Sequence, residues 1–172
     1  MRLIVEAVRL IDGIADGPIE HVDVVVDDDR ISAVVPHGTS ASRSGAAATP
    51  PPTVIDGRGR TLLPGLIDAH AHYTFDPTEG SLQVIARRSD AEILARAEAH
   101  AAVALRAGIT TARGAGSVRG LELVLRDRIA AGLATGPRIV ATGTAIGAPD
   151  GHGIAFGVGL AVSMPSWRQR IR

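Results

Sequence analysis

The chain has 172 residues, enough for one sizeable domain or two small ones, and 45% of them are hydrophobic, which excludes a mostly disordered protein. Its 18 basic and 18 acidic residues give zero net charge, so we expect no nucleic acid partner. Every basic residue is arginine, and cysteine is absent, which excludes disulfides and thiolate metal sites. Glu6 and Arg9 interrupt the start too early for a signal peptide, and no apolar run approaches the roughly 20 residues of a membrane span. We therefore expect a cytoplasmic protein with no membrane partner.

Residues 1–61 predict a small β-rich region. β-Branched runs at 3–5, 8–11, 21–26 and 30–35 are typical of short strands. The last two runs flank the polar turn Asp27-Asp28-Asp29 and therefore predict a hairpin. Residues 38–52 are rich in Pro, Ser and Ala and predict a flexible surface loop, and another strand is expected at 53–55.

Residues 62–72 form the most informative stretch of the chain. This apolar segment, entered through Pro64-Gly65, predicts a strand that ends in His70-Ala71-His72. Side chains alternate faces along a strand, so Asp68, His70 and His72 are expected on one face. Two imidazoles on one face at the end of a strand can bind one metal ion together.

The second half of the chain alternates helical and extended patterns. A helix is expected over residues 89–107, with Ser89 or Asp90 as its N-cap and Gly108 at its end. A strand at 109–113, a helix at 118–131 and a strand at 138–142 follow. This order favours parallel βαβ units. A glycine-rich loop at 143–153 carries His152, and residues 157–172 have no clear period and stay unassigned.

Several other features have simpler interpretations. Gly114-Ala115-Gly116 follows a strand as a dinucleotide-binding loop would, but Arg119 stands where the third glycine belongs, so we reject nucleotide binding. His21, His37 and His100 are expected to be structural. Arg113, at the end of a strand, has two open interpretations: a bidentate contact with a substrate carboxylate, or an ion pair with a neighbouring carboxylate.

Four ordered motifs resemble the amidohydrolase superfamily of metal-dependent hydrolases. Pro64-Gly65-Leu66-Ile67-Asp68-Ala69-His70-Ala71-His72 is similar to its signature strand. Ile11-Asp12-Gly13 with the strands around it resembles the superfamily's β-sandwich platform, and the stretch from Ala107 to Arg113 resembles its second barrel strand. Residues 136–143 with Gly151-His152-Gly153 resemble its imidazolonepropionase-like and prolidase-like branch. The resemblance covers residues 1–156.

The resemblance implies an α/β fold with a β-sandwich at residues 1–61 and, at 62–156, the first three β/α units of an incomplete (β/α)8 TIM barrel. It implies that His70 and His72 bind a divalent metal, zinc first, with manganese, iron and nickel as alternatives. Asp68 would support a ligand imidazole from behind, and His152 and Arg113 would contact substrate. The implied reaction is hydrolysis of a C–N bond, in a dipeptide, a non-peptide amide or a cyclic amide, by metal-activated water. A small-molecule amide is therefore the expected partner.

The chain also departs from the superfamily pattern. A lysine completes the metal site in many members, and this chain contains no lysine. A full barrel needs about 250 residues, so we expect an N-terminal portion of such an enzyme that associates through open sheet edges. Two alternatives stay open: an inactive fragment, and a small β-rich interaction module in which the histidines are relics.

Overall fold

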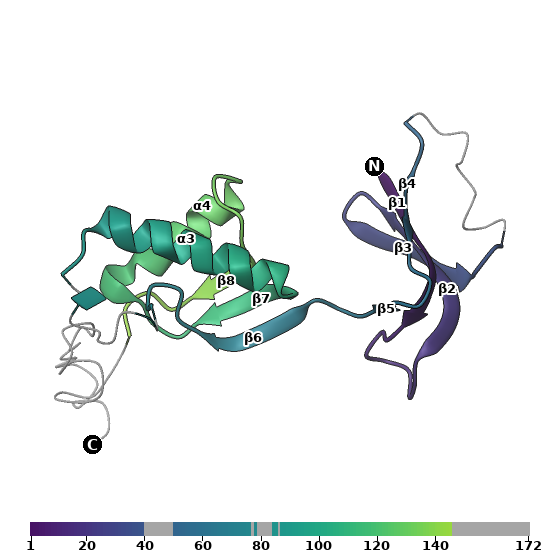
Figure 1. Ribbon diagram of the computed structural model, residues 1–172, viewed down its shortest axis with the longest axis horizontal. Coiled ribbons are helices and arrows are strands. Elements are labelled where there is room, and N and C mark those ends of the chain that lie inside the picture. The colour runs from purple at the N-terminus through teal and green to yellow at the C-terminus, as the bar shows by residue number, and fades with distance from the viewer. Residues whose placement is uncertain (40–49, 77, 79–83, 86, 146–172) are drawn as a thin grey trace, which may run out of the picture. The chain divides into compact units, whose positions relative to one another are not determined.

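A computed structural model describes residues 1–39, 50–76, 78, 84–85, 87 to 145 of the chain. Contacts between Cα atoms divide the chain into two compact units, Met1–Pro64 and Gly65–Arg172, and each unit is described by itself (Figure 1). Most of the expected loop at 38–52, the loop residue His152 and the tail 157–172 lie outside the described residues. Within the described part, no helix is long and apolar enough to cross a membrane.

The described residues of the N-terminal unit form one five-stranded sheet. Its strands are β1 (Arg2–Leu10), β2 (Ile19–Asp27), β3 (Arg30–Pro36), β4 (Thr53–Asp56) and β5 (Thr61–Leu62). The order is β3-β2-β1-β4, and β5 also pairs with β1. β2 runs antiparallel to both β1 and β3, whereas β4 and β5 run parallel to β1. The described residues of this unit give one sheet, and the expected β-sandwich stays a prediction.

The expected hairpin is present, but the strand before it differs from the prediction. β2 and β3 are joined at Asp28, which adopts a left-handed φ of 56°. Residues 3–5 and 8–11 were expected as two strands and belong to a single strand, β1, except Ile11, which follows it. β1 continues across an irregularity at Ala7, whose N–H donates to Asp23 Oδ1 at 2.8 Å. A side-chain acceptor therefore replaces the lost ladder bond.

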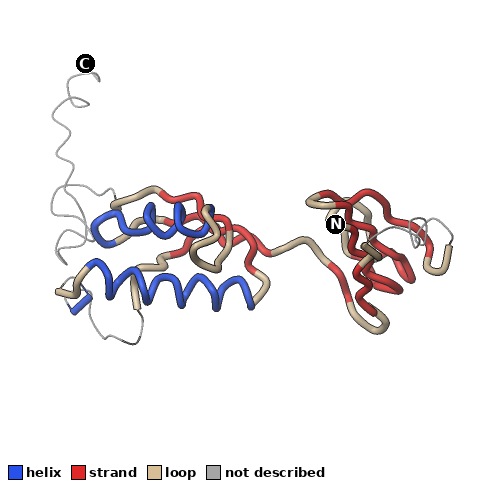
Figure 2. Tube along the Cα trace, turned by 90° about the horizontal axis from the view of Figure 1, so that it is seen from above, coloured by secondary structure: helices blue, strands red, loops and turns tan. Residues whose placement is uncertain are grey.

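The C-terminal unit is a three-stranded sheet covered by two helices. Its strands are β6 (Leu66–Ala71), β7 (Ile109–Gly114) and β8 (Arg138–Ala141), in that order and all parallel. The helices α3 (Asp90–Arg106) and α4 (Leu121–Ala130) connect them and pack on the same face of the sheet (Figure 2). The expected strand–helix–strand–helix–strand order is confirmed.

Two expected elements have different bounds from those predicted. The strand expected at 62–72 is divided: Leu62 ends β5 in the N-terminal unit, and β6 begins only at Leu66. Pro64 explains the break, since it has no N–H to donate to a sheet. The helix expected at 118–131 is a short 3-10 turn, η1 (Val118–Gly120), followed by α4, because Arg119 and Gly120 have φ values of 49° and 70°. Left-handed residues cannot continue a right-handed helix.

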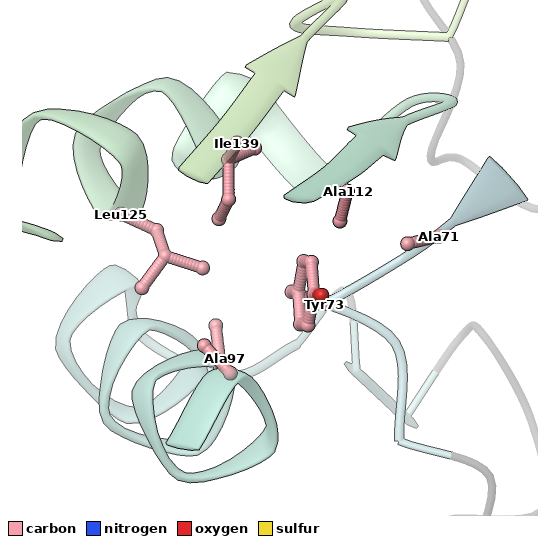
Figure 3. Close-up of a cluster of buried hydrophobic side chains, with 7 residues drawn as sticks. Ala71, Tyr73, Ala97, Ala112, Leu125 and Ile139 are labelled. Atoms are coloured by element: carbon pink, nitrogen blue, oxygen red, sulfur yellow. The ribbon is translucent and has the colours of Figure 1, made fainter. Parts of the chain in front are cut away.

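The core between helices and sheet is built largely from alanine (Figure 3). Small side chains let a helix approach a sheet closely, so larger side chains at these alanine positions would push the helices away from the sheet. Leu125 of α4 and Ile139 of β8 supply most of the volume, and Tyr73 closes one end. The buried members are Ala71, Tyr73, Ala97, Ala101, Ala112, Leu125 and Ile139.

Candidate metal centre

A bulge in β6 decides which side chains face which side of the sheet. Asp68 pairs with Ala112, and Ala71 pairs with Gly114. The two pairs are three residues apart along β6 but only two apart along β7, so β6 contains one extra residue. Residues paired on neighbouring strands project to the same face. Ala112 is completely buried under the helices, so Asp68 belongs to the helix-covered face. The expectation that Asp68 shares a face with His70 and His72 is wrong, because the extra residue breaks the alternation on which it rested.

The two histidines do converge. His70 Nε2 and His72 Nε2 lie 3.1 Å apart, and their rings meet edge to face with centroids 5.0 Å apart. Ala71, between them, is buried against the helices, so both imidazoles project from the opposite face. His70 is exposed and His72 is half-buried. The prediction that these two side chains lie together is confirmed.

The ring of His72 is fixed from behind by the backbone. Its Nδ1 lies 2.9 Å from the carbonyl oxygen of Gly116, and its ring stacks on Phe75 at 4.9 Å between centroids. A carbonyl oxygen only accepts, so Nδ1 carries a proton, and Nε2 is the nitrogen whose lone pair can bind a cation. Hydrogen bonds of this kind hold metal-binding histidines in one tautomer.

Gly116 has a reason to be glycine at this point. Its φ of 132° is one that L side chains rarely adopt. A Cβ there would lie 2.7 Å from Cβ of Ala145, too close for any side chain. Sequence reasoning missed this supporting group because the acceptor is a backbone carbonyl, which no residue pattern marks. Phe75 was missed as well, and its only signal was an aromatic ring three residues after His72.

Asp68 supports the site through the backbone and not through an imidazole. Its Oδ1 accepts the N–H of His70 at 2.9 Å. This bond spans the bulge and satisfies an amide that the irregular ladder leaves without a strand partner. We expected Asp68 to contact a histidine ring. Instead, the carbonyl of Gly116 contacts the ring of His72, and Asp68 accepts a hydrogen bond from the backbone amide of His70.

Arg113 lies on β7 beside the bulge. Its exposed guanidinium donates to the carbonyl of Ala69 at 3.3 Å, and its strand partner in β8 is Val140. It alternates with buried Ala112 and therefore shares the uncovered face with the histidines. No ion pair between Arg113 and a carboxylate occurs among the described residues, and both interpretations of Arg113 stay predictions.

The histidine pair fits a transition metal as part of a larger ligand set. Zinc–nitrogen bonds of 2.0–2.1 Å at a tetrahedral centre separate two ligand nitrogens by about 3.3 Å, close to the observed 3.1 Å. Imidazole nitrogen is a common zinc, iron, nickel and copper ligand. No group of three or more His, Cys, Asp or Glu side chains suited to a metal occurs among the residues that the structure describes. The pair therefore supplies two ligands and leaves other positions open.

Comparison with known proteins identifies the kind of chain that carries this arrangement. The model of the amidohydrolase family matches residues 61–162, more than half of the sequence. The chain belongs to the amidohydrolase family. A comparison of this amidohydrolase with curated proteins found no match.

Solved structures similar to this amidohydrolase include three hydrolases. A Xaa-Pro dipeptidase with bound methionine in its active site is 29% identical, with a TM-score of 0.70, over 85% of this chain and 34% of its own. A prolidase complexed with N-methylphosphonate-L-proline is 29% identical, with a TM-score of 0.74, over 89% and 34%. Phenylurea hydrolase B is 30% identical, with a TM-score of 0.70, over 84% and 31%. This amidohydrolase chain thus spans about a third of the length of the structures it matches.

Proposed function

We propose that this chain contributes two metal ligands, His70 and His72, to a metal-dependent hydrolase of amide or cyclic amide C–N bonds. The observation that carries the proposal is the convergence of the two Nε2 atoms at 3.1 Å, with His72 held in the required tautomer by Gly116. Membership of the amidohydrolase family supports the reaction class.

The arrangement of the C-terminal unit supports a (β/α)8 barrel as the setting. Its strands are parallel and adjacent in chain order, and among the described residues helices cover one face. The other face exposes apolar side chains, with Ile67 73% and Val140 58% exposed. In such barrels the strand face away from the helices is the packed interior, and the active site lies at the C-terminal strand ends. His70, His72 and Arg113 lie at those ends.

Each residue then has a distinct task. His70 and His72 would hold zinc, manganese, iron or nickel through Nε2, while Gly116 and the Asp68 bond to the His70 amide keep the pair aligned. Such a metal, when bound, lowers the pKa of a coordinated water and polarises a carbonyl oxygen. Arg113 would bind a carboxylate of the substrate with its planar fork.

The substrate class follows from Arg113 and from the similar structures. A guanidinium beside the metal-binding pair favours an amide that also carries a carboxylate, as a dipeptide or an N-acyl amino acid does. Two of the similar structures are a Xaa-Pro dipeptidase and a prolidase complexed with an L-proline derivative. A carboxylate-bearing small amide is therefore the substrate we propose.

One observation favours a second function. Among the described residues no third His, Cys, Asp or Glu side chain completes a metal site with the pair, and the sequence contains no lysine to act as a base. These two ligands are also consistent with a module that binds a metal without catalysing hydrolysis, or with one that acts only in an interaction.

Metal analysis tests the proposal directly. Tag-free protein incubated with zinc or manganese and dialysed should retain metal, and His70→Ala and His72→Ala should each lose most of it. His21→Asn is the matched control, since His21 is an exposed histidine of the N-terminal unit and asparagine tolerates its left-handed backbone. Equal metal content in all four proteins would contradict the assignment. Retained metal without hydrolysis of dipeptides would select the second function.

A further inference from the structure

The N-terminal unit contains an open pocket of about 460 Å³, lined by charged and apolar side chains, that the proposed function does not use. It lies along β1 and β2 and is closed on one side by the segment that leads into β5. Residues that matter to its chemistry are Ala7, Arg9, Glu20, His21, Arg58 and Arg60. We call it the arginine pocket.

The backbone around the arginine pocket is irregular in both long strands. Val5 pairs with Val24 and Val8 with Val22, so β1 has an extra residue. The next two pairs are Val8 with Val22 and Leu10 with Ile19, so here the extra residue lies in β2. Bulges that follow one another on opposite strands bend a sheet sharply, and such bulges are common beside binding sites.

At both bulges a non-glycine residue adopts a left-handed backbone conformation. Ala7 and His21, one on each strand, have φ values of 55° and 54°. Non-glycine residues are held in that region only when the surroundings require it, and such strain clusters at functional sites. The buried carboxylate of Asp23, 1% exposed, enforces it by accepting the N–H of Ala7 at 2.8 Å and contacting His37 Nδ1 at 2.7 Å.

The charges in the arginine pocket leave one guanidinium without an anion. Arg9 pairs with Glu20 at 3.0 Å, and Arg58 binds Asp56 with its closest contact at 2.6 Å. Arg60 is exposed and has no carboxylate partner within the part of the chain that the structure describes. It helps Arg58 to lower the pKa of Asp56 without forming an ion pair with it. Three guanidinium groups therefore surround the cavity, with one carboxylate in its wall.

We propose that the arginine pocket binds a small oxyanion, a phosphate or a carboxylate group, through the guanidinium of Arg60. The planar fork of arginine matches both groups with two parallel hydrogen bonds. Arg9 and Arg58 flank the ligand and add long-range attraction, whereas their own carboxylates limit how much negative charge the pocket accepts. The site is separate from the histidine pair and does not depend on the function proposed for it.

Calorimetric titration of the full chain with inorganic phosphate and, separately, with succinate tests the proposal. We expect one of the two anions to bind at millimolar concentration or below, and Arg60→Gln to weaken it at least about tenfold, the loss expected for a charge-assisted hydrogen bond. The tighter of the two anions identifies the ligand class. Arg30→Gln is the control, because Arg30 is an exposed arginine of the same unit with only a 3.9 Å contact to Asp29.

Two further comparisons keep the experiment decisive. The double variant His70→Ala/His72→Ala should bind the anion as the original chain does, since the arginine pocket lies in the other unit. Loss of binding in that variant would place the anion at the histidines and overturn the proposal. Absence of binding, or equal weakening by Arg60→Gln and Arg30→Gln, would overturn it as well.

Discussion

Glu122 is a buried acidic side chain that should lower the stability of the fold when it is ionised. It is completely buried at the start of α4, and neither carboxylate oxygen has a hydrogen-bond partner among the described residues. Its carboxylate lies where a side chain of residue 114 would be, 1.7 Å from an ideal Cβ built on Gly114. Burial raises its pKa to about 7, and the Tyr73 amide, which lies near the carboxylate but outside hydrogen-bonding geometry, opposes this shift only weakly. An ionised carboxylate without partners is expensive in such a place.

Glu122 should therefore make folding pH-dependent. Because its pKa is higher in the folded state than the ordinary 4.5, the folded chain binds the proton more tightly. The free energy of unfolding should fall as pH rises from about 4.5 to 7, by about 3 kcal/mol. Glu122→Gln, which cannot ionise, should lose this decrease in urea titrations at several pH values. Glu20→Gln, at an exposed glutamate, should keep it, and identical pH profiles for Glu122→Gln and the original chain would contradict the argument.

At the same scale, spacing alone predicted the histidine pair but not its surroundings. His-x-His on a strand places two rings on one face as long as no bulge falls between them. Asp68 lies two residues before His70, but the same rule failed there because one extra residue in β6 moves the following side chains to the opposite face of the sheet. A bulge depends on hydrogen bonding to β7, so no pattern within β6 could reveal it.

Among the elements, α3 follows its local sequence closely. Ser89 is the N-cap, and its hydroxyl and amide exchange bonds with the amide and carboxylate of Glu92 in a capping box. The capping residue at its start and the glycine after its last turn made this helix predictable. α4 was less predictable, because the left-handed Arg119 is held from outside by Asp90 and the carbonyl of Arg88. Contacts between distant segments decide such a break.

The capping box of α3 should be measurable in stability. Ser89→Ala removes the acceptor for the Glu92 amide, and we expect the free energy of unfolding to fall by about 1 kcal/mol. The same change removes the hydroxyl bond that does most to lower the pKa of Glu92 and leaves the bond from the residue 89 amide, so that pKa should rise part of the way toward its ordinary value. Ser89→Thr keeps the hydroxyl and should retain most of the stability. Chemical unfolding and NMR titration of Glu92 measure the two effects, and an Ala variant as stable as the Thr variant would refute the cap.

At the scale of the whole molecule, the C-terminal unit has an open parallel sheet. Among the described residues, β6 and β8 each pair only with β7, so each has one unpaired edge. Parallel sheets are normally covered on both faces, and exposed edges promote pairing with other chains. The order of strands and helices was predictable from the sequence. The resemblance to a barrel family also predicted that the face away from the helices is an interior face, and the described residues leave that face open.

The open sheet predicts self-association. The 172-residue chain should sediment as dimers or larger species whose share increases with protein concentration. Arg113→Glu on the uncovered face should change that equilibrium, whereas Arg30→Glu in the N-terminal unit should leave it unchanged. Analytical ultracentrifugation at low and high concentration is the measurement. A single monomeric species throughout, with cooperative thermal unfolding, would show that the sheet edges are covered in solution.

The converging imidazoles of His70 and His72 also affect how the protein has to be handled. Two accessible ring nitrogens aimed at one point should retain the untagged chain on a nickel-charged resin, and it should elute at lower imidazole than a polyhistidine-tagged protein does. A polyhistidine tag would bind the same ions as the site and obscure its stoichiometry. Purification by ion exchange or with a cleavable affinity partner therefore decides whether metal measurements on this chain can be interpreted.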